Sequence, residues 1–239
     1  MLRALQLSQS MRVVRGRGTT IEADRALTAE LREHAAEHDE PAVRVWRPQP
    51  QVAFGRRDSG APGYDRARRI ARQHGYAPVG RSVGGRAVAY QGTTVAFARA
   101  EPVDDPRTGL QDRYEAATEA LEDALETVGV EEISAGEPDD SFCPGSHSLS
   151  VGGGKVVGIA QRVTTEAALV AGVAIPRDRW PIAEVLEDVY DALDVAFDPC
   201  TVGSIEAAGG DGDPDALVTA IEERLVGQHD PVVERIEQS

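Results

Sequence analysis

Lysine is almost missing from this sequence of 239 residues, in which Lys155 stands alone beside 24 arginines. Cysteine is scarce as well. Two cysteines cannot form the disulfide framework of a small secreted domain, so we expect a reducing, cytoplasmic compartment. No apolar run reaches the ~18 residues that a membrane span needs, and residues 1–18 lack the hydrophobic core of a secretory signal. We therefore expect no membrane partner.

Basic residues are outnumbered by acidic ones. The chain has 40 Asp and Glu against 25 Lys and Arg, which gives a net charge of −15. Such a surface is a poor partner for phosphates, so we expect no nucleic-acid partner. Many acids with little lysine are typical of adaptation to high salt, which concerns solubility rather than activity. In a chain that has otherwise discarded lysine, Lys155 indicates a need for a primary ammonium.

Hydrophobic periodicity predicts helices mixed with strands, without the regular alternation of a doubly wound sheet, and this indicates an α+β fold. Helices are expected over residues 22–37, 64–74, 109–128, 182–193 and 215–226. Strands are expected over residues 42–48, 51–55, 77–79, 86–90, 93–99, 148–151, 155–162 and 166–175. A polar stretch precedes the last helix, so we divide the chain into a domain over 1–195 and a linker with a helical appendage over 196–239.

Gly84 and Gly85 stand between two expected strands, with Arg81 and Arg86 on either side. Adjacent glycines let a ligand approach the backbone, their N–H groups can form a nest for an anion, and the arginines can act as charged clamps. The alternative is that these residues form an ordinary turn between two strands and bind no ligand. The stretch has neither the G-x-G-x-x-G pattern of dinucleotide sites nor the pattern of a phosphate loop.

Cys143 and Lys155 form a second candidate site. Cys143 lies in a loop before an expected β-hairpin, and Lys155 begins the second strand of that hairpin. Strand alternation places Lys155 on the same face as Val157 and Ile159, where an ammonium needs an anion or a polarised carbonyl. An ammonium close to Cys143 would favour its thiolate, the nucleophilic form. A buried structural cysteine and an exposed lysine are the alternative.

His34 and His38 match the H-x-x-E-H spacing, in which two histidines one helical turn apart can share a metal. The match is short, and spacing identifies no further ligand. We therefore interpret the segment as a half-buried helix face and expect no metal site.

Three segments resemble the biotin/lipoate protein ligase and lipoyl/octanoyl transferase superfamily. They are VRVWRPQPQVAFGRR at 43–57, RSVGGRAVAYQGTTVAFA at 81–98 and KVVGIAQR at 155–162. The second resembles the family's R-x-S-G-G-x-A-V segment, and the third resembles K-x-x-G-x-x-Q-R. Each is weak alone, but three in the family's order are fairly specific. The resemblance implies a ligase-like catalytic domain with a mixed, mostly antiparallel sheet flanked by helices.

Within the superfamily, the element Cys143-Pro144-Gly145 followed by Lys155 resembles the cysteine-dependent octanoyltransferases. This resemblance implies that Cys143 carries the acyl group as a thioester and that Lys155 contacts the acyl carbonyl or an acyl-adenylate. It also implies a set of substrate-binding residues, namely Arg81, Gly84, Gly85, Arg86 and Gly158.

Three positions depart from the family's pattern. Val83 replaces a usual Ser, and Ala171 stands where ligases often have His. Ser148 stands where many ATP-using relatives have Asp, which counts against adenylation.

We expect the protein to transfer an octanoyl or lipoyl group to a lysine of a lipoyl-domain protein through a thioester, without a cofactor. By the resemblance, the partners are the glycine-cleavage H protein and the E2 subunits of 2-oxoacid dehydrogenases, with an octanoyl or lipoyl donor. Lys155 or His147 would deprotonate the incoming amine. An acyl tunnel would be lined by Phe97, Val156, Val157 and Ile159.

Two alternatives stay open from the sequence. The first is a lipoate–protein ligase that works through an acyl-adenylate and requires ATP and Mg²⁺, for which Cys143 would be dispensable. The second is a non-catalytic binder of lipoyl domains or acyl groups.

Overall fold

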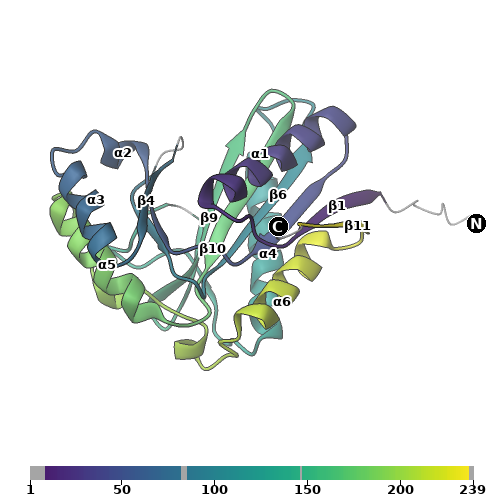
Figure 1. The fold of residues 1–239 in the computed structure, drawn as a ribbon. Helices are drawn as coiled ribbons and strands as arrows, with labels where there is room; N and C mark the ends of the chain where they lie inside the picture. Colours follow the sequence, from purple (N-terminus) through teal and green to yellow (C-terminus); the bar gives the residue numbers. More distant parts are fainter. Residues whose placement is uncertain (1–8, 82–84, 146, 237–239) are drawn as a thin grey trace, which may run out of the picture.

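The chain folds around two β-sheets that face each other across a cleft (Figure 1). The computed structural model of the protein describes residues 9–81, 85–145 and 147–236. The larger sheet contains β1 (Ser10–Arg15), β2 (Ala42–Trp46), β6 (Val95–Pro102), β7 (Ser134–Ala135), β8 (Ser148–Val151), β9 (Gly154–Val163), β10 (Ala167–Ala174) and β11 (Asp230–Arg235). The smaller sheet contains β3 (Gln51–Phe54), β4 (Ala77–Gly80) and β5 (Val88–Tyr90).

Strand order confirms the α+β fold with a mixed, mostly antiparallel sheet. The larger sheet has the order β11-β1-β2-β6-β10-β9-β8-β7, and the smaller sheet has the order β4-β3-β5. The pairs β1–β11, β1–β2 and β3–β4 are parallel, and the others are antiparallel. The antiparallel meander β8-β9-β10 follows from short loops, since neighbours joined by a few residues can only reverse direction.

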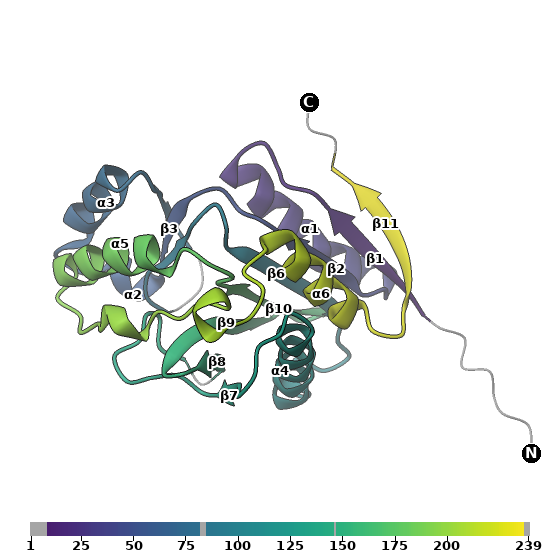
Figure 2. The same ribbon diagram turned by 90° about the horizontal axis from the view of Figure 1, so that it is seen from below.

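Helices cover both sheets, which buries the apolar faces of the strands (Figure 2). They are α1 (Ile21–His38), α2 (Arg56–Ser59), α3 (Tyr64–Gln73), α4 (Leu110–Thr127), α5 (Arg179–Ala192) and α6 (Pro214–Val226). Short 3₁₀ turns lie at Pro199–Thr201 and Glu206–Ala208. Leu121 of α4 and Ile221 of α6 share one core with the larger sheet, whereas Leu31 of α1 packs against the opposite face. Helices α3 and α5 cover the smaller sheet.

Strands β2 and β3 follow each other in the chain but belong to different sheets. Pro48 and Pro50 lie between them, and a proline has no N–H to continue a ladder. The chain therefore leaves the larger sheet after Trp46 and enters the smaller sheet at Gln51. This crossing sets the two sheets on either side of the cleft.

A buried ion pair fixes α1 to β2. Arg44 is fully buried and donates to the carboxylate of Asp24, and its Nη2 also donates to the carbonyl of Gly16 at 3.0 Å. The guanidinium lies 4.2 Å from the ring centre of Trp46. Burial lowers the pKa of Arg44, and the hydrogen bond to Asp24 opposes that effect. Because a charge this deep is costly without its partner, the pair specifies how α1 sits on the sheet.

Residues 196–236 join the same sheet and core as the rest of the chain. Helix α6 packs against α4 and β2, and β11 pairs with β1 along its full length. The helix was predicted, whereas β1 and β11 were not, and all six residues of β11 are exposed, so no apolar alternation marks it. The division of the chain near residue 195 stays a prediction about folding units.

Candidate active site

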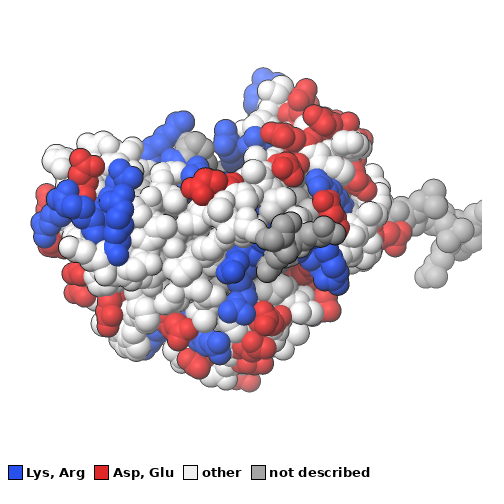
Figure 3. Space-filling view, viewed as in Figure 1, with Lys and Arg blue, Asp and Glu red and all other residues white. Residues whose placement is uncertain are grey.

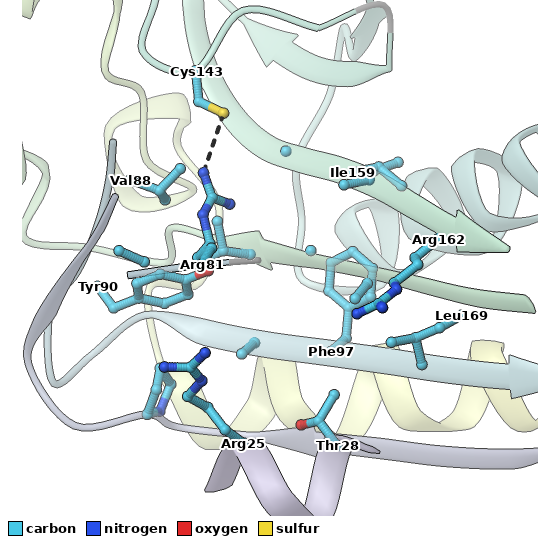
Figure 4. A pocket seen from close by; sticks show the side chains of 18 of the residues that line it. Arg25, Thr28, Arg81, Val88, Tyr90, Phe97, Cys143, Ile159, Arg162 and Leu169 are labelled. Carbon is cyan, nitrogen blue, oxygen red and sulfur yellow. Dashed lines mark hydrogen bonds between the residues drawn. The ribbon is translucent and has the colours of Figure 1, made fainter. Parts of the chain in front are cut away.

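A cavity of about 460 Å³ opens in the cleft between α1, the larger sheet and the smaller sheet (Figure 4). Its size is within the range of roughly 300–1,000 Å³ that small-molecule sites occupy. Phe97, Ile159 and Leu169 supply apolar walls, and Cys143 lies at one end. Gly158 and Gly172 also line the cavity, and a Cβ added at Gly158 would meet only the Lys155 side chain, at 3.5 Å.

Cys143 is held by its backbone in an unusual conformation. Its φ is +45°, in the left-handed region that non-glycine residues seldom adopt. Its N–H donates to the hydroxyl of Tyr190 at 2.6 Å, and that hydroxyl donates to the carbonyl of Ala87 at 3.0 Å. Burial raises the pKa of Tyr190, so the hydroxyl keeps its proton. Backbone strain of this kind persists only where surrounding contacts enforce it, and it is common at functional sites.

The cation beside the sulfur of Cys143 is Arg81. Its Nη2 lies 3.7 Å from Sγ, and the same nitrogen donates to the carbonyl of Arg86 at 2.5 Å (Figure 4). Burial lowers the pKa of Arg81, but the neighbouring Tyr90, Cys143 and Asp58 outweigh it and raise the pKa. Arg81 is therefore a permanent positive charge at the point where a thiolate would form.

Lys155 is almost fully buried, at 2% exposure, and is bound to the loop that carries Cys143. Its Nζ donates to Glu137 at 2.9 Å and to the carbonyls of Phe142 and Cys143 at 3.0 and 3.3 Å. Glu137 in turn accepts from the N–H of Gly145 at 2.6 Å. An ammonium has three hydrogens, and each of these partners can take one. Lys155 thus fixes the position of the Cys143 loop.

The other predicted site residues separate into those that meet at the cavity and those that do not. Gly85 adjoins the sulfur, since a Cβ added to it would lie 2.9 Å from Sγ of Cys143. Gly158 lies next to Lys155, and a Cβ there would lie 3.5 Å from Cε. Arg86 is not among the described lining residues, because its guanidinium pairs with buried Asp58 at 3.3 Å. Gly84 lies outside the described residues.

His147 lines the same cavity. The imidazole stacks on Tyr114, with ring centres 3.6 Å apart. Of the predicted tunnel residues, Phe97 and Ile159 line the cavity. Val156 and Val157 are instead buried in the core of the larger sheet.

Two residues of the site had no signal in the sequence. Glu137 stands in an acidic stretch, where one carboxylate cannot be told from its solvated neighbours. Tyr190 lies in α5, 47 residues from Cys143 in the chain, and reads as one more apolar position of a helix. The departure at Ser148 gives a partial clue to Glu137, because its hydroxyl donates to Glu137 at 3.2 Å.

The described part of the cavity offers little to a magnesium ion. Asp24 is the carboxylate among its lining residues, and it is paired with Arg44. Glu137, which holds the loop, is paired with Lys155. Within residues 9–81, 85–145 and 147–236, no group of three or more His, Cys, Asp or Glu side chains could hold a metal ion. Neither is there, in that part of the chain, a helix long and apolar enough to cross a membrane.

Cleft, cavity and cysteine lie together in one α+β domain. Residues 21–178 match the family described as "Lipoyl protein ligase A/B catalytic domain", and the chain belongs to this family. A lipoyl-[GcvH]:protein N-lipoyltransferase of Listeria monocytogenes is 31% identical over 149 residues, which are 62% of this chain and 53% of the relative. An octanoyl-[GcvH]:protein N-octanoyltransferase of Geobacillus kaustophilus is 34% identical over 127 residues, or 53% and 44%. The chain thus spans about half the length of these curated relatives.

Solved structures show the same fold. A putative lipoate protein ligase of Thermoplasma acidophilum with bound lipoic acid has a TM-score of 0.67 at 17% identity, over 97% of this chain and 91% of that one. A lipoate-protein ligase A bound with ATP has a TM-score of 0.68, also at 17% identity, over 96% and 90%. At this identity the likeness establishes the fold alone. It includes the mostly antiparallel sheet that the resemblance implied.

Proposed function

We propose that this protein transfers an octanoyl or lipoyl group between lysines of lipoyl-domain proteins through a thioester on Cys143. The observation that carries the proposal is the placement of Sγ at the end of an apolar cavity, beside Arg81 and against the backbone of Gly85. The relatives named as octanoyl- and lipoyl-[GcvH]:protein N-transferases support it. By that resemblance, the glycine-cleavage H protein is a partner, and E2 subunits are further acceptors.

The chemistry balances without a nucleotide. The Cys143 thiol gives up its proton and the thiolate attacks the acyl carbonyl of the donor's lysine amide; the C–N bond breaks, and the donor amine leaves with that proton. The acceptor's lysine amine then attacks the thioester, the C–S bond breaks, and the thiolate returns. One amide is consumed and one is formed, so the overall exchange is close to thermoneutral. A cysteine nucleophile suits this division into two steps.

Arg81 is the group we assign to the developing negative charge. Its guanidinium lies close enough to Sγ to face the oxyanion of an attacked carbonyl. The N–H of Cys143 is already bound to Tyr190, and the N–H of Gly145 is bound to Glu137, so neither is free for this role. A donor placed at an oxyanion is commonly worth about 3 kcal/mol of barrier.

Lys155 is assigned to position the nucleophile, with Glu137 as its counter-ion. The two loop carbonyls that Lys155 holds include that of Cys143 itself. Contact of Nζ with an acyl carbonyl would have to replace one of these bonds. An ammonium engaged with Glu137 and two carbonyls is not a proton acceptor, so we assign deprotonation of the incoming amine to His147, whose imidazole lines the cavity.

The ATP-dependent ligase is the alternative that the same fold allows. The carboxylates at and beside the cavity are each paired with a cation, which argues against a bound Mg²⁺, and no step is assigned to a nucleotide. The transferase route predicts that Cys143 is essential. The ligase route predicts that ATP and Mg²⁺ are essential and Cys143 is not.

An intact-mass experiment separates these routes. The protein is incubated with octanoyl-pantetheine, without nucleotide, and the expected result is one octanoyl adduct that is absent in Cys143→Ser and retained in Cys200→Ser. Cys200 is the matched control because it is the other cysteine and is exposed. Octanoyl transfer from octanoylated H protein to an apo lipoyl domain should then proceed without ATP.

Two results would contradict the proposal. Acceptor modification that needs ATP and survives Cys143→Ala would establish the ligase. Binding of the H protein with no acyl transfer under either condition would establish a non-catalytic binder.

A further inference from the structure

An arginine-rich surface covers α2 and α3 on one side of the cleft (Figure 3). The stretch 56–74 contains six arginines and two aspartates, in a chain whose net charge is −15. Arg56, Arg57, Arg69 and Arg72 are exposed, and Arg68 is half-buried. We call these five residues the α2–α3 arginine surface. Its positive charge is the reverse of the charge of the whole molecule.

Asp65 of α3 is an exposed carboxylate among these arginines, and the ion pairs of the neighbouring acids leave most of the positive charge uncompensated. Helix α5 neutralises one flank, where Asp191 pairs with Arg66 at 3.3 Å and Asp188 pairs with His74 at 2.7 Å. Asp58 is buried and pairs with Arg86, outside the surface. Among the described residues, no ion pair to a carboxylate is formed by the five arginines of the α2–α3 surface. Their guanidinium groups are therefore available to an incoming carboxylate.

The α2–α3 arginine surface comes near the cavity wall at its Tyr64 and α2 end, whereas α3 itself covers the other face of the smaller sheet. Arg68 lies over the ring of Tyr64, 5.6 Å from its centre, and the hydroxyl of Tyr64 lies 3.9 Å from where a Cβ of Gly80 would be. Gly80 and Arg81 line the cavity. Helix α2 is tied to the same edge, since Asp58 within it pairs with Arg86 at the end of the Arg81 loop. A protein that inserts an acylated lysine into the cavity would rest its body on this rim.

We propose that the α2–α3 arginine surface docks the acyl-carrier protein, and that the carrier presents carboxylates around its modified lysine. The inference rests on the proposed function. A carrier with an acidic face would be repelled by most of this molecule and attracted to this rim, which orients the lysine toward Cys143. Donor and acceptor must reach the same sulfur in turn, so one surface serves both. Complementary charges of this kind act mainly on the rate and specificity of encounter.

The test uses two variants with the same change in net charge. The triple variant R57E/R69E/R72E reverses the α2–α3 arginine surface. The control R107E/R224E/R235E reverses three exposed arginines elsewhere, including one on β11, which lies across the molecule from α3 (Figure 2). Each protein is assayed for binding of apo H protein by isothermal titration calorimetry, and for acylation of Cys143 by octanoyl-pantetheine, which needs no docking.

The expected result is a selective loss in the first variant. Binding of apo H protein weakens about tenfold or more at low ionic strength, while acylation by octanoyl-pantetheine stays within about twofold of wild type. The control changes neither by more than about twofold. Rising salt brings wild-type affinity toward that of the variant, because screening removes the attraction. Lysines introduced in place of carboxylates beside the H protein's modified lysine restore binding to R57E/R69E/R72E.

Several outcomes would overturn the docking surface. One is unchanged binding in R57E/R69E/R72E, and another is an equal loss in the control. A third is binding of a single-stranded oligonucleotide at this surface without binding of H protein. If the triple variant fails to fold, R57Q/R69Q/R72Q replaces it and should give a smaller loss of the same kind. If wild type binds H protein here but transfers no acyl group, the proposed function fails and the docking surface stands.

Discussion

The ion pair between Lys155 and Glu137 makes a quantitative prediction, because it is buried and joins the hairpin to the Cys143 loop. The side chains of Lys155 and Glu137 are 3% and 17% exposed. Removing one partner of a buried pair costs about 3–5 kcal/mol when the other is left uncompensated. Glu137→Gln leaves a buried ammonium with only carbonyl partners, so we expect a loss of about 3 kcal/mol in the free energy of unfolding.

Lys155→Met should cost less than Glu137→Gln. Glu137 keeps the N–H of Gly145 and the hydroxyl of Ser148 as donors and is partly reached by water, so we expect a loss of about 2 kcal/mol. In a chain of this length, 1 kcal/mol shifts the melting temperature by roughly 2–4 °C. Glu137→Gln should therefore melt roughly 6–12 °C below wild type.

A double-mutant cycle by denaturant unfolding measures the interaction itself. The double variant Lys155→Met with Glu137→Gln should be more stable than the sum of the two losses predicts, by about 1 kcal/mol or more. Lys155→Met should also acylate Cys143 more slowly, because the carbonyl of Cys143 loses a fixed donor. Additive losses of stability, or wild-type acylation in Lys155→Met, would refute the reasoning.

Three further predictions follow from single positions. Gly85→Ala and Gly75→Ala each place a methyl on a residue with positive φ, +89° and +83°, so each should lose about 1 kcal/mol of stability. Only at Gly85 would the added Cβ meet Sγ of Cys143, at 2.9 Å. We therefore expect only Gly85→Ala to abolish the octanoyl adduct measured by intact mass. Gly172→Ala would place Cβ 2.1 Å from a backbone oxygen, so thermal unfolding should show a strongly destabilised protein. In Gly158→Ala the new Cβ meets only Lys155, at 3.5 Å. This variant should fold normally, and a series of acyl chain lengths should show that it accepts shorter chains than wild type. Burial raises the pKa of Tyr76 to about 12, so the folded state holds this proton more tightly than the unfolded state and stability should fall as pH rises from 10 to 12. Tyr76→Phe should lose about 3 kcal/mol less than wild type over that range in unfolding titrations. Parallel curves of stability against pH for the two proteins would contradict the assignment.

Long helices and strands could be predicted from the sequence because apolar residues recur in them at the spacing of one buried face. The helix expected over 109–128 is α4 (Leu110–Thr127), with Leu121 and Leu125 on its buried stripe. The hairpin of β8 and β9 was marked by the glycines between them. Family membership was also predictable, since three short motifs in order carry information that no single one carries, and the match over 21–178 confirms it.

Elements and contacts without a repeated local pattern could not be predicted. Strand β11 is exposed on every residue, and its pairing with β1 joins segments more than two hundred residues apart in the chain. The cation at the sulfur was expected to be Lys155, and the contact belongs to Arg81. Strand alternation predicts the face of the sheet on which a side chain lies. It does not predict whether Arg81 or Lys155, which come from different segments, lies nearer to Sγ of Cys143. Glu137 was hidden for the same reason among its acidic neighbours.

Cys143 is anchored from two directions at once. Its N–H is bound to Tyr190 in α5, which covers the smaller sheet, and its carbonyl is bound to Lys155 in β9 of the larger sheet. The peptide groups of one residue thus bridge the two halves of the molecule. A ligand that opens the cleft, or a partner that closes it, changes the spacing of those halves. Such a change must rotate the Cys143 backbone and move its sulfur. The rate at which Cys143 reacts with a thiol reagent would therefore report the width of the cleft.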